Sequence, residues 1–161
     1  MPDSISVAPV TPDDWTSWRQ LRLAALSDAP EAFGSSYETE RERDEQGWRN
    51  RIAVPGTLMI ATLDGEPAGI VGGYVPRESV AELISMWVAP VSRGRGVGDA
   101  LVDATLSWAR GELARTIELW VMRGNTLAEA LYARHGFERT GAVETDPAHR
   151  CAGQLALSRP L

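Results

Sequence analysis

In the middle of this chain, an apolar stretch is followed by a glycine-rich turn and then by an amphipathic stretch. This succession restricts the folds that the chain can adopt. Val80–Val88 is apolar on both faces of a strand, which is typical of a strand inside a sheet. Pro90 ends it, and glycines alternate with other residues in Arg93–Gly98. Apolar residues then recur at helical spacing over Val97–Arg110, which predicts a helix. A right-handed crossover would place the next predicted strand, Thr116–Val121, parallel to the first.

Helix-like and strand-like segments alternate along the rest of the chain, which indicates a mixed α/β fold. Asp64-Gly65 predicts a hairpin turn, and Thr11 before Pro12 predicts a helix start. The other predicted strands are Ile5–Val10, Thr57–Leu63, Pro67–Val75, Phe137–Val143 and Gly153–Leu157, and the other predicted helices are Pro12 to Leu26, one within Glu31–Arg51, and one from Asn125 or Thr126 to His135.

Details within these elements follow from side-chain type. In the charged segment, Trp48 and Ile52 are expected to face inward, and Gly72-Gly73 is expected to mark a β-bulge. The helix after the glycines is expected to bury Val97, Leu101, Ala104 and Trp108 and to stop at Gly111. We therefore expect one domain over residues 1–161. Its central mixed sheet would have about six or seven strands and about four helices, in the order βααβββαβαββ.

Composition excludes several classes of function. The formal net charge is −6, whereas non-specific nucleic-acid binding is mainly electrostatic, so we expect no nucleic-acid partner. Apolar runs are far shorter than the ~20 residues that span a bilayer, so we expect no membrane partner. The N-terminus has no signal-peptide pattern, and a single cysteine, Cys151, leaves no internal disulfide, so we expect a cytoplasmic protein. With only His135 and His149 as histidines, we expect no metal site.

The segment Arg93–Gly98, here called the glycine loop, predicts an anion site. The first turn of a helix has unpaired N–H groups and a positive dipole end, where a phosphate binds well. Glycines let the backbone approach the ligand, and Arg93 and Arg95 add charge. A Walker A loop needs a lysine, but all 16 basic residues are arginine, and the dinucleotide fingerprint needs a different glycine spacing. The alternative is a flexible loop that carries two basic residues.

Two separate blocks of sequence resemble one family. The first follows an apolar strand that ends in Val-x-Pro, and the second begins with an asparagine at a helix start and ends in Gly-Phe. The blocks comprise Arg93, Gly96 and Gly98, and then Asn125, Ala128, Ala130-Leu131-Tyr132 and His135-Gly136-Phe137. They resemble motifs A and B of the GCN5-related N-acetyltransferases (GNAT). The resemblance covers Val80 to Thr140, and the N-terminal half matches by element order.

The resemblance implies an N-acetyltransferase with a GNAT-like fold that uses acetyl-CoA. The strands ending near Val88 and Val121 would splay apart, and backbone groups freed by the splay would bond the pantetheine arm. N–H groups of the glycine loop would hold the pyrophosphate. The implied coenzyme-binding residues are Trp87, Val88, Arg93, Gly94, Arg95, Gly96, Val97, Gly98, Asn125 and Tyr132.

Acetyl transfer to an amine needs a neutral amine and a protonated leaving thiolate, because a free alkyl amine has a pKa of about 10. The resemblance implies Tyr132 as the acid, and the alternative is a tyrosine packed in the core. Glu82 is the candidate base, since it lies 93 − 82 = 11 residues before Arg93, the offset of the base glutamate in the histone-acetylating branch. The alternatives are an exposed Glu82 or a water-mediated proton path. Direct attack in a ternary complex suffices, so Cys151 is not required as a covalent relay.

The preferred acceptor is a primary amine on a small molecule. Its pocket is expected to be lined by Asp28–Glu40 and by the loop near Glu144–His149. The candidate substrate-contacting residues are Phe33, Tyr37 and Trp120. One alternative is a protein or peptide acetyltransferase, which needs an open groove, and another is a non-catalytic acyl-CoA sensor. Family members are often dimers, so a homodimer stays open.

Overall fold

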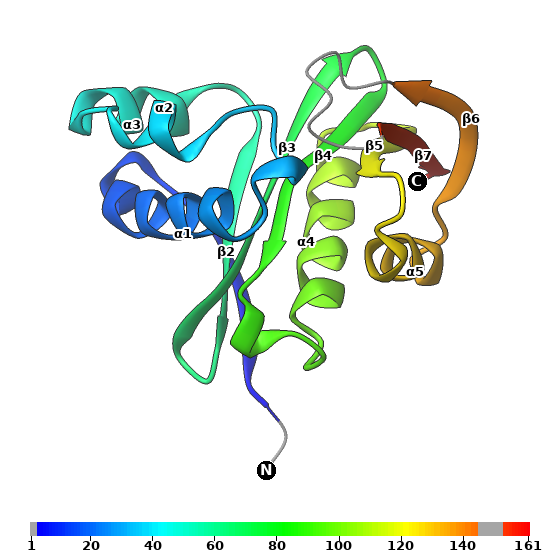
Figure 1. Ribbon diagram of the computed structural model, residues 1–161. Coiled ribbons are helices and arrows are strands. Elements are labelled where there is room, and N and C mark those ends of the chain that lie inside the picture. Colours follow the sequence, from blue (N-terminus) through cyan, green and yellow to red (C-terminus); the bar gives the residue numbers. More distant parts are fainter. Residues whose placement is uncertain (1–2, 145–152) are drawn as a thin grey trace.

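One mixed β-sheet organises the protein in the computed structural model, which describes residues 3–144 and 153–161 (Figure 1). The order of strands across the sheet is β1-β2-β3-β4-β5-β7-β6. Neighbouring strands are antiparallel except β4 and β5, which are parallel as the crossover rule predicts. The strands are β1 (Ile5–Pro9), β2 (Thr57–Leu63), β3 (Glu66–Arg77), β4 (Val80–Val88), β5 (Thr116–Met122), β6 (Glu138–Glu144) and β7 (Gln154–Pro160).

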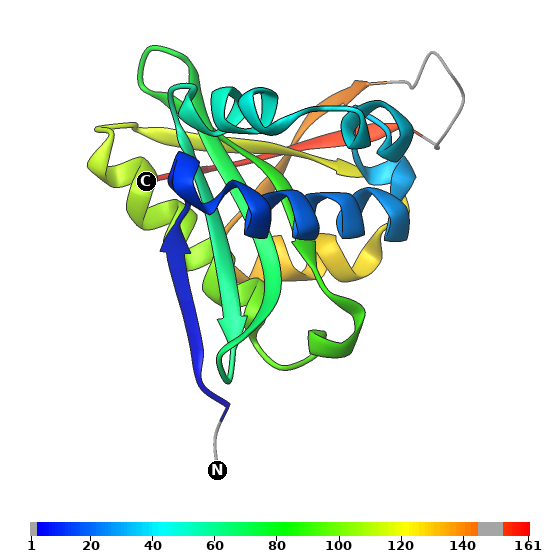
Figure 2. The ribbon, with the colours of Figure 1, turned by 90° about the vertical axis from the view of Figure 1, so that its left-hand side faces the viewer.

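Helices cover both faces of the sheet (Figures 1 and 2). The helices α1 to α3 pack on one face and close a core that includes Trp18, Trp48 and Ile52, the last two as expected. The helices α4 and α5 pack on the other face over a larger core. None of the helices in the described part of the chain is long and apolar enough to cross a membrane. They are α1 (Trp15–Asp28), α2 (Tyr37–Arg41), α3 (Glu45–Ala53), α4 (Val97–Gly111) and α5 (Thr126–Arg134).

The predicted fold class and element order are confirmed, with one helix more than expected. Two N-caps divide the charged segment into α2 and α3. The Ser36 hydroxyl accepts a hydrogen bond from the Thr39 N–H, and the Asp44 carboxylate accepts one from the Gly47 N–H. Each cap starts a new helix, so the segment cannot continue as one.

The central strands β4 and β5 separate soon after they pair. Their parallel register covers only Val80–Glu82 against Thr116–Glu118. Beyond that point, the segment 83–88 of β4 has no β-sheet partner on its β5 side among the described residues. The predicted splay is therefore present, and it opens toward the glycine loop at the far end of β4.

An irregularity in β4 lies opposite the Gly72-Gly73 pair. Ile70 pairs with Trp87 and Gly72 with Ile84, so β4 carries the extra residue. Ser85 there has a φ of +58°. The expected bulge thus belongs to β4 rather than to the glycine strand. Gly73 serves packing instead, since a Cβ at this position would lie 2.5 Å from the Trp108 ring.

The buried face and the end of α4 also differ from the expectation. Ala104 and Trp108 are only partly buried, whereas Val102 and Leu106 are fully packed. The helix continues through Gly111, and Leu113 takes the left-handed conformation with a φ of +60°. The apolar face of α4 is wider than the four positions expected from the sequence. A prediction that follows one line of residues at helical spacing misses the buried residues beside that line.

Candidate active site

The glycine loop leads into α4, and the backbone N–H groups of residues 97–99 at the start of this helix are here called the cradle. Gly94 and Gly96 have φ values of +76° and +92°, a region that favours glycine, and Gly96 is the N-cap of α4. The first helical hydrogen bond runs from the Ala100 N–H to the Gly96 carbonyl at 3.1 Å. The three N–H groups between these residues therefore have no acceptor within the helix. The conformation fits a pyrophosphate held by backbone N–H groups.

The two arginines of the loop already contact carboxylates. Arg93 donates to the Asp28 carboxylate at 2.6 Å and to the Val88 carbonyl at 3.0 Å. Arg95 donates twice to Asp3, at 2.6 and 2.8 Å, and so reaches toward the start of β1. An anion in the loop would meet backbone donors first, and the arginine charges are partly neutralised by these acidic partners.

The end of β4 beside the splay is tied to α1. The Trp87 indole donates to Asp28 at 3.0 Å, and its ring is buried in the core under α1. Hydrogen bonds from Trp87 and Arg93 hold the pKa of Asp28 below its ordinary value. These contacts fix the strand segment whose backbone groups are the candidate pantetheine partners.

The helix α5 carries the two candidate residues on the other side of the splay. The Asn125 side-chain oxygen caps the helix by accepting a hydrogen bond from the Ala128 N–H at 3.2 Å. Its amide N–H₂ makes no hydrogen bond to any other described residue. Tyr132 is 5% exposed and packs edge-to-face on Phe137, with ring centroids 5.7 Å apart. Burial raises the pKa of the Tyr132 hydroxyl, so it stays protonated and can donate a proton.

A pocket of about 530 Å³ lies on the α1–α3 face, where the end of α3 and the loop after it meet β2, β3 and β4. Glu82 of β4 lines this pocket and accepts a hydrogen bond from the Tyr74 hydroxyl at 3.0 Å. Burial raises the pKa of Glu82, and the Tyr74 hydrogen bond partly opposes that rise. A half-buried carboxylate with a raised pKa beside a pocket has the properties of a general base.

The residues expected to contact the substrate lie elsewhere. Phe33 is buried under the Arg22 guanidinium, 4.8 Å from its ring centroid. Tyr37 begins α2, and Trp120 lies on β5 with 37% of its surface exposed. None of the three lines the pocket at Glu82. Of the expected Glu144–His149 loop only its first residue is described, and His149 and Cys151 lie outside the described residues.

Sequence reasoning missed a polar cluster between α1, α2 and β4. Arg22 makes two hydrogen bonds to the Glu40 carboxylate, at 2.9 and 3.0 Å, and a third to the Ser85 hydroxyl at 3.2 Å. Glu40 is 4% exposed. Burial alone would raise its pKa, but Arg22 holds the pKa below the ordinary value. Arg22 lies four residues after Trp18 and four before Leu26, so helical spacing places it on the buried face of α1, although it does not identify the partner.

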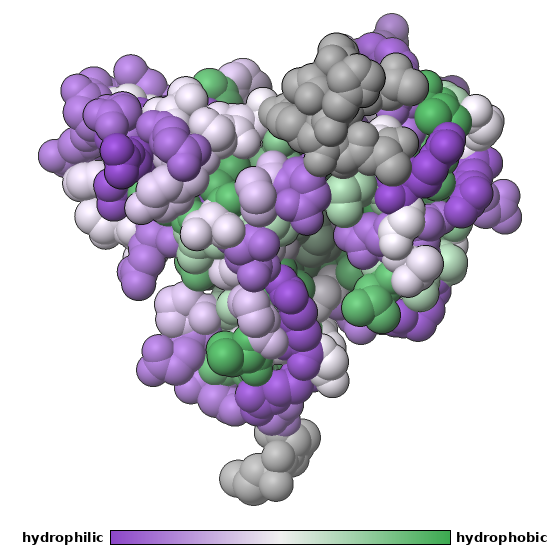
Figure 3. Space-filling model, in the orientation of Figure 1, coloured by the Kyte–Doolittle hydropathy of each residue, from purple (hydrophilic) through white to green (hydrophobic). Residues whose placement is uncertain are grey.

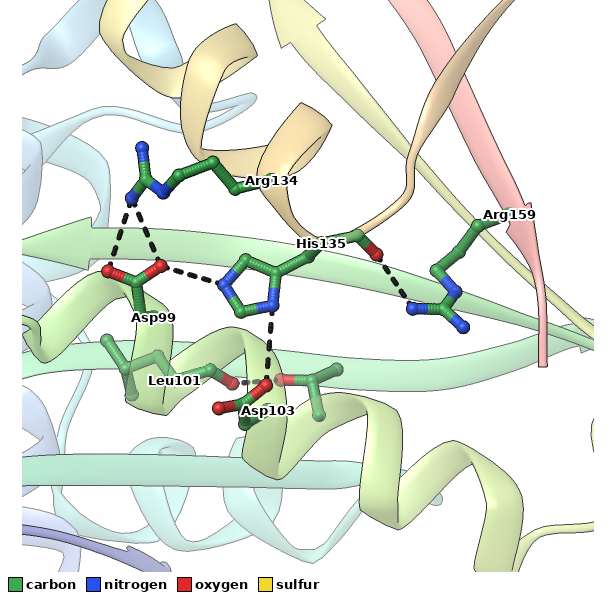
Figure 4. Close-up of polar contacts among 7 residues, drawn as sticks. Asp99, Leu101, Asp103, Arg134, His135 and Arg159 are labelled. Atoms are coloured by element: carbon green, nitrogen blue, oxygen red, sulfur yellow. Dashed lines mark hydrogen bonds and ion pairs between the residues drawn. The ribbon is translucent and has the colours of Figure 1, made fainter.

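His135 joins α5 to α4 (Figure 4). One ring nitrogen lies 2.8 Å from the Asp99 carboxylate and the other 3.3 Å from Asp103. Arg134 also donates to Asp99 at 3.0 Å, and Arg159 of β7 donates to the His135 carbonyl at 2.7 Å. The contacts join two helices and a strand, so His135 has the structural role that its place at a helix end suggests.

The surface agrees with a site between the helical layers. In Figure 3, a hollow in the middle of the face has pale and green residues at its bottom, beside a column of purple polar residues. The glycine loop follows the segment 83–88 of β4, and it lies against α5, since a Cβ on Gly98 would lie 3.2 Å from the Leu131 side chain. The arrangement can hold an extended, anionic ligand along β4.

Known proteins share this arrangement. The model of the acetyltransferase (GNAT) family matches residues 15–137. The mycothiol acetyltransferase of Cellulomonas flavigena is 30% identical, over 100% of this chain and 48% of its own length. The chain thus spans about half the length of the curated relatives it matches.

Solved structures agree over nearly the whole chain. A GCN5-related N-acetyltransferase from Kribbella flavida superposes with a TM-score of 0.76 at 26% identity, covering 98% of both chains. The PaiA N-acetyltransferase of Thermoplasma acidophilum, solved in complex with coenzyme A, superposes with a TM-score of 0.75 at 16% identity, covering 98% of this chain and 99% of that one.

The sheet topology and the match to the family model agree on one class of protein, the acetyltransferases of the GNAT type. The chain belongs to the acetyltransferase (GNAT) family, because the family model covers residues 15–137 of its 161. The resemblance of the two sequence blocks is thereby confirmed, while the role of each site residue stays a prediction.

Proposed function

We propose that this chain transfers the acetyl group of acetyl-CoA to a primary amine of a small molecule, by direct attack within a ternary complex. The observation that carries the proposal is the splay of β4 from β5 beyond Glu82. It separates an anion cradle at one end of the segment 83–88 from a pocket with a carboxylate at the other. A coenzyme along the strand would bring its thioester toward the acceptor.

The coenzyme would bind through the glycine loop and the free edge of β4. The unpaired N–H groups at the start of α4 would hold the pyrophosphate, and the backbone of Trp87 and Val88 would bond the pantetheine arm. The amide N–H₂ of Asn125, which bonds no other residue in the described ranges, is available to the same arm. The coenzyme complex of the Thermoplasma relative supports this choice of ligand.

The chemistry would divide between two protonation sites. Glu82, directly or through a water, would accept a proton from the ammonium, and the neutral nitrogen would attack the thioester carbonyl. A β4 backbone N–H near Val88 would stabilise the oxyanion. Tyr132 would then protonate the leaving thiolate as the C–S bond breaks, and it would regain a proton from the former amine nitrogen, which becomes the neutral amide. Acetylated amine and CoA would depart, and Glu82 would release its proton to solvent.

A small acceptor is favoured over a peptide by the size of the pocket. Its 530 Å³ volume lies within the range of about 300–1,000 Å³ that small-molecule sites occupy. The relatives named mycothiol acetyltransferase are named for a small molecule, which supports the same choice. The alternatives that the experiment must distinguish from this proposal are an enzyme that acetylates peptides and a non-catalytic acyl-CoA sensor.

The test is thiol release from acetyl-CoA with a panel of amino acids, polyamines, aminoglycosides and short peptides. We expect turnover with one class of small amine. Tyr132→Phe should reduce kcat by about 100-fold or more, with little change in coenzyme affinity, because general-acid catalysis contributes about 10²–10⁴-fold.

The outcomes separate the parts of the proposal. An unchanged kcat in Tyr132→Phe would remove the acid from the mechanism. Turnover of peptides alone would favour the peptide enzyme. Tight coenzyme binding without turnover of any amine would favour a sensor, and no coenzyme binding would overturn the assignment of the glycine loop.

A further inference from the structure

The pocket at Glu82 has a second charged residue in its wall. Arg51, in the last turn of α3, lines the same pocket as Glu82 and Tyr74. Its side chain is partly buried, yet it makes no hydrogen bond and no ion pair with any residue in 3–144 or 153–161. A half-buried guanidinium at the wall of a pocket can exchange its bound water for the oxygens of a ligand, so Arg51 is available to bind one.

The neighbours of Arg51 leave an excess of positive charge at this wall. Arg22 and Arg43 share one carboxylate, that of Glu40, at 2.9 and 3.9 Å. Burial lowers the pKa of the Arg51 guanidinium, and the charges of Arg22 and Arg43 lower it further, opposed only by Glu40. Arg22 and Arg43 thus share the Glu40 carboxylate, and Arg51 has no ion pair of its own among the described residues, although the whole chain has a net charge of −6.

The wall at Glu82 carries a carboxylate. Burial raises the pKa of Glu82, the hydrogen bond from Tyr74 and the charge of Arg77 oppose the rise, and the charges of Glu118 and Glu144 add to it. No ion pair joins Glu82 to Arg51 within the described residues, so the two groups stand apart. Apolar side chains, among them Ile52, Leu58 and Ile84, line the pocket as well.

We infer that the acceptor is an amine that also carries an oxyanion, with its nitrogen at Glu82 and its oxyanion on the Arg51 guanidinium. The inference rests on the proposed function and names the substrate class for the same pocket. The planar guanidinium offers paired donors to a carboxylate or a phosphate. A plain alkylamine would leave Arg51 unpaired, and a polycation such as spermidine would be repelled by it.

Matched pairs of amines that differ only in the anion provide the test. The pairs are leucine with isoamylamine, phenylalanine with phenethylamine, and O-phosphoethanolamine with ethanolamine. For at least one pair we expect the anionic member to have a kcat/KM about 10–100-fold higher, as charged hydrogen bonds typically provide. The pair that responds identifies the oxyanion as carboxylate or phosphate.

Variants assign the preference to one side chain. Arg51→Gln should abolish the preference, and Arg51→Lys should keep part of it because the charge remains. Arg110→Gln is the matched control: Arg110 is exposed in the last turn of α4, outside the pocket, and its loss should leave the ratio unchanged. Circular dichroism and CoA titration of each variant verify folding.

Measurements of amine binding, made without acetyl transfer, distinguish a failure of this inference from a failure of the proposed function. In the presence of CoA, calorimetry should detect leucine or O-phosphoethanolamine but not the matched plain amine, and Arg51→Gln should lose that binding. If plain amines are acetylated as well as or better than their anionic partners, the inference is overturned while the acetyltransferase stands. If anionic amines bind but are not acetylated, the function fails while the Arg51 site stands. Equal binding of both members, or of neither, overturns the inference.

Discussion

The Tyr74–Glu82 pair sets the proton affinity of the proposed base. Glu82 must be ionised to act, and burial raises its pKa above the ordinary 4.5. The kcat/KM should therefore rise with pH through a midpoint above that value. The hydrogen bond from Tyr74 stabilises the ionised form and lowers the pKa, so Tyr74→Phe should move this rise to higher pH. The pH profile of kcat/KM for wild type and variant measures the shift.

Glu82→Gln should be measured beside Tyr74→Phe. It should lose most of the activity, and its kcat/KM should no longer show the rise at low pH, which is here called the acid limb. The same burial predicts the sign of a stability effect. A carboxyl whose folded pKa lies above its unfolded value binds its proton more tightly when folded, so unfolding becomes easier as pH rises through that range. In thermal melts, the stability of Glu82→Gln should not fall in this way as the pH rises. An acid limb that Tyr74→Phe leaves in place would belong to another group, such as a different carboxylate or the substrate.

At the residue scale, the sequence could single out Glu82 and Tyr132 as candidates but could not predict their surroundings. The offset from Arg93 and the helix before Gly-Phe are local patterns, and the resemblance carries them. Arg51 and Tyr74 were missed because strand register and the packing of α3 bring them to Glu82. Neither has a local signature. The same reason explains Phe33, which the helical layer buries under Arg22 rather than exposing to a substrate.

At the scale of elements, the start of α4 depends on the left-handed conformation of Gly96. A side chain there strains the backbone, although its Cβ would meet only Ile5 Cδ1 at 3.5 Å. Gly96→Ala should therefore shift the N–H groups of the cradle and weaken CoA binding by on the order of 10-fold or more, since such strain costs about 1–3 kcal/mol. Calorimetric titration of CoA measures the change.

Gly111, at the other end of α4, is the matched control. It lacks a positive φ, and a Cβ there meets nothing within 4 Å. Gly111→Ala should keep CoA affinity and stabilise the fold by about 0.4–1 kcal/mol, because alanine reduces the entropy of the unfolded chain. Equal CoA affinity in Gly96→Ala and wild type would mean that the coenzyme does not use the cradle.

Element positions were predictable where one periodicity dominates. The bounds of β2 and β4 were predicted from runs of apolar residues, and the N-cap of α5 from Asn125. The bulge was misplaced because glycines suggested it, whereas the extra residue lies at Ser85 in the opposite strand. Whether a glycine serves a bulge or the packing of Trp108 depends on tertiary contacts, which a local pattern does not contain.

At the scale of the whole molecule, the splay divides the strands of the sheet into two parts that share little backbone pairing. The strands β1 to β4 form one part and β5, β7 and β6 the other, and the parallel pairing between them is limited to Val80–Glu82 with Thr116–Glu118. Side chains join the two parts as well, since the core under α4 and α5 contains residues of both, and His135 contacts Asp99 and Asp103 of α4. A coenzyme that contacts β4, the glycine loop and α5 together would bridge both parts.

Coenzyme binding should therefore protect both sides of the splay from hydrogen exchange. With CoA at 100 times its Kd, the folded state gains about 2.7 kcal/mol, and a chain of this size should melt roughly 5–10 °C higher. Amide exchange should slow in the segment 83–88 and in α5 as well as in the glycine loop, because the pantetheine arm is proposed to run between them. Gly96→Ala at the same CoA concentration should show less protection in all three segments. Protection confined to the glycine loop, with α5 exchanging as in the free protein, would mean that the pyrophosphate alone is held and that the arm does not cross the splay.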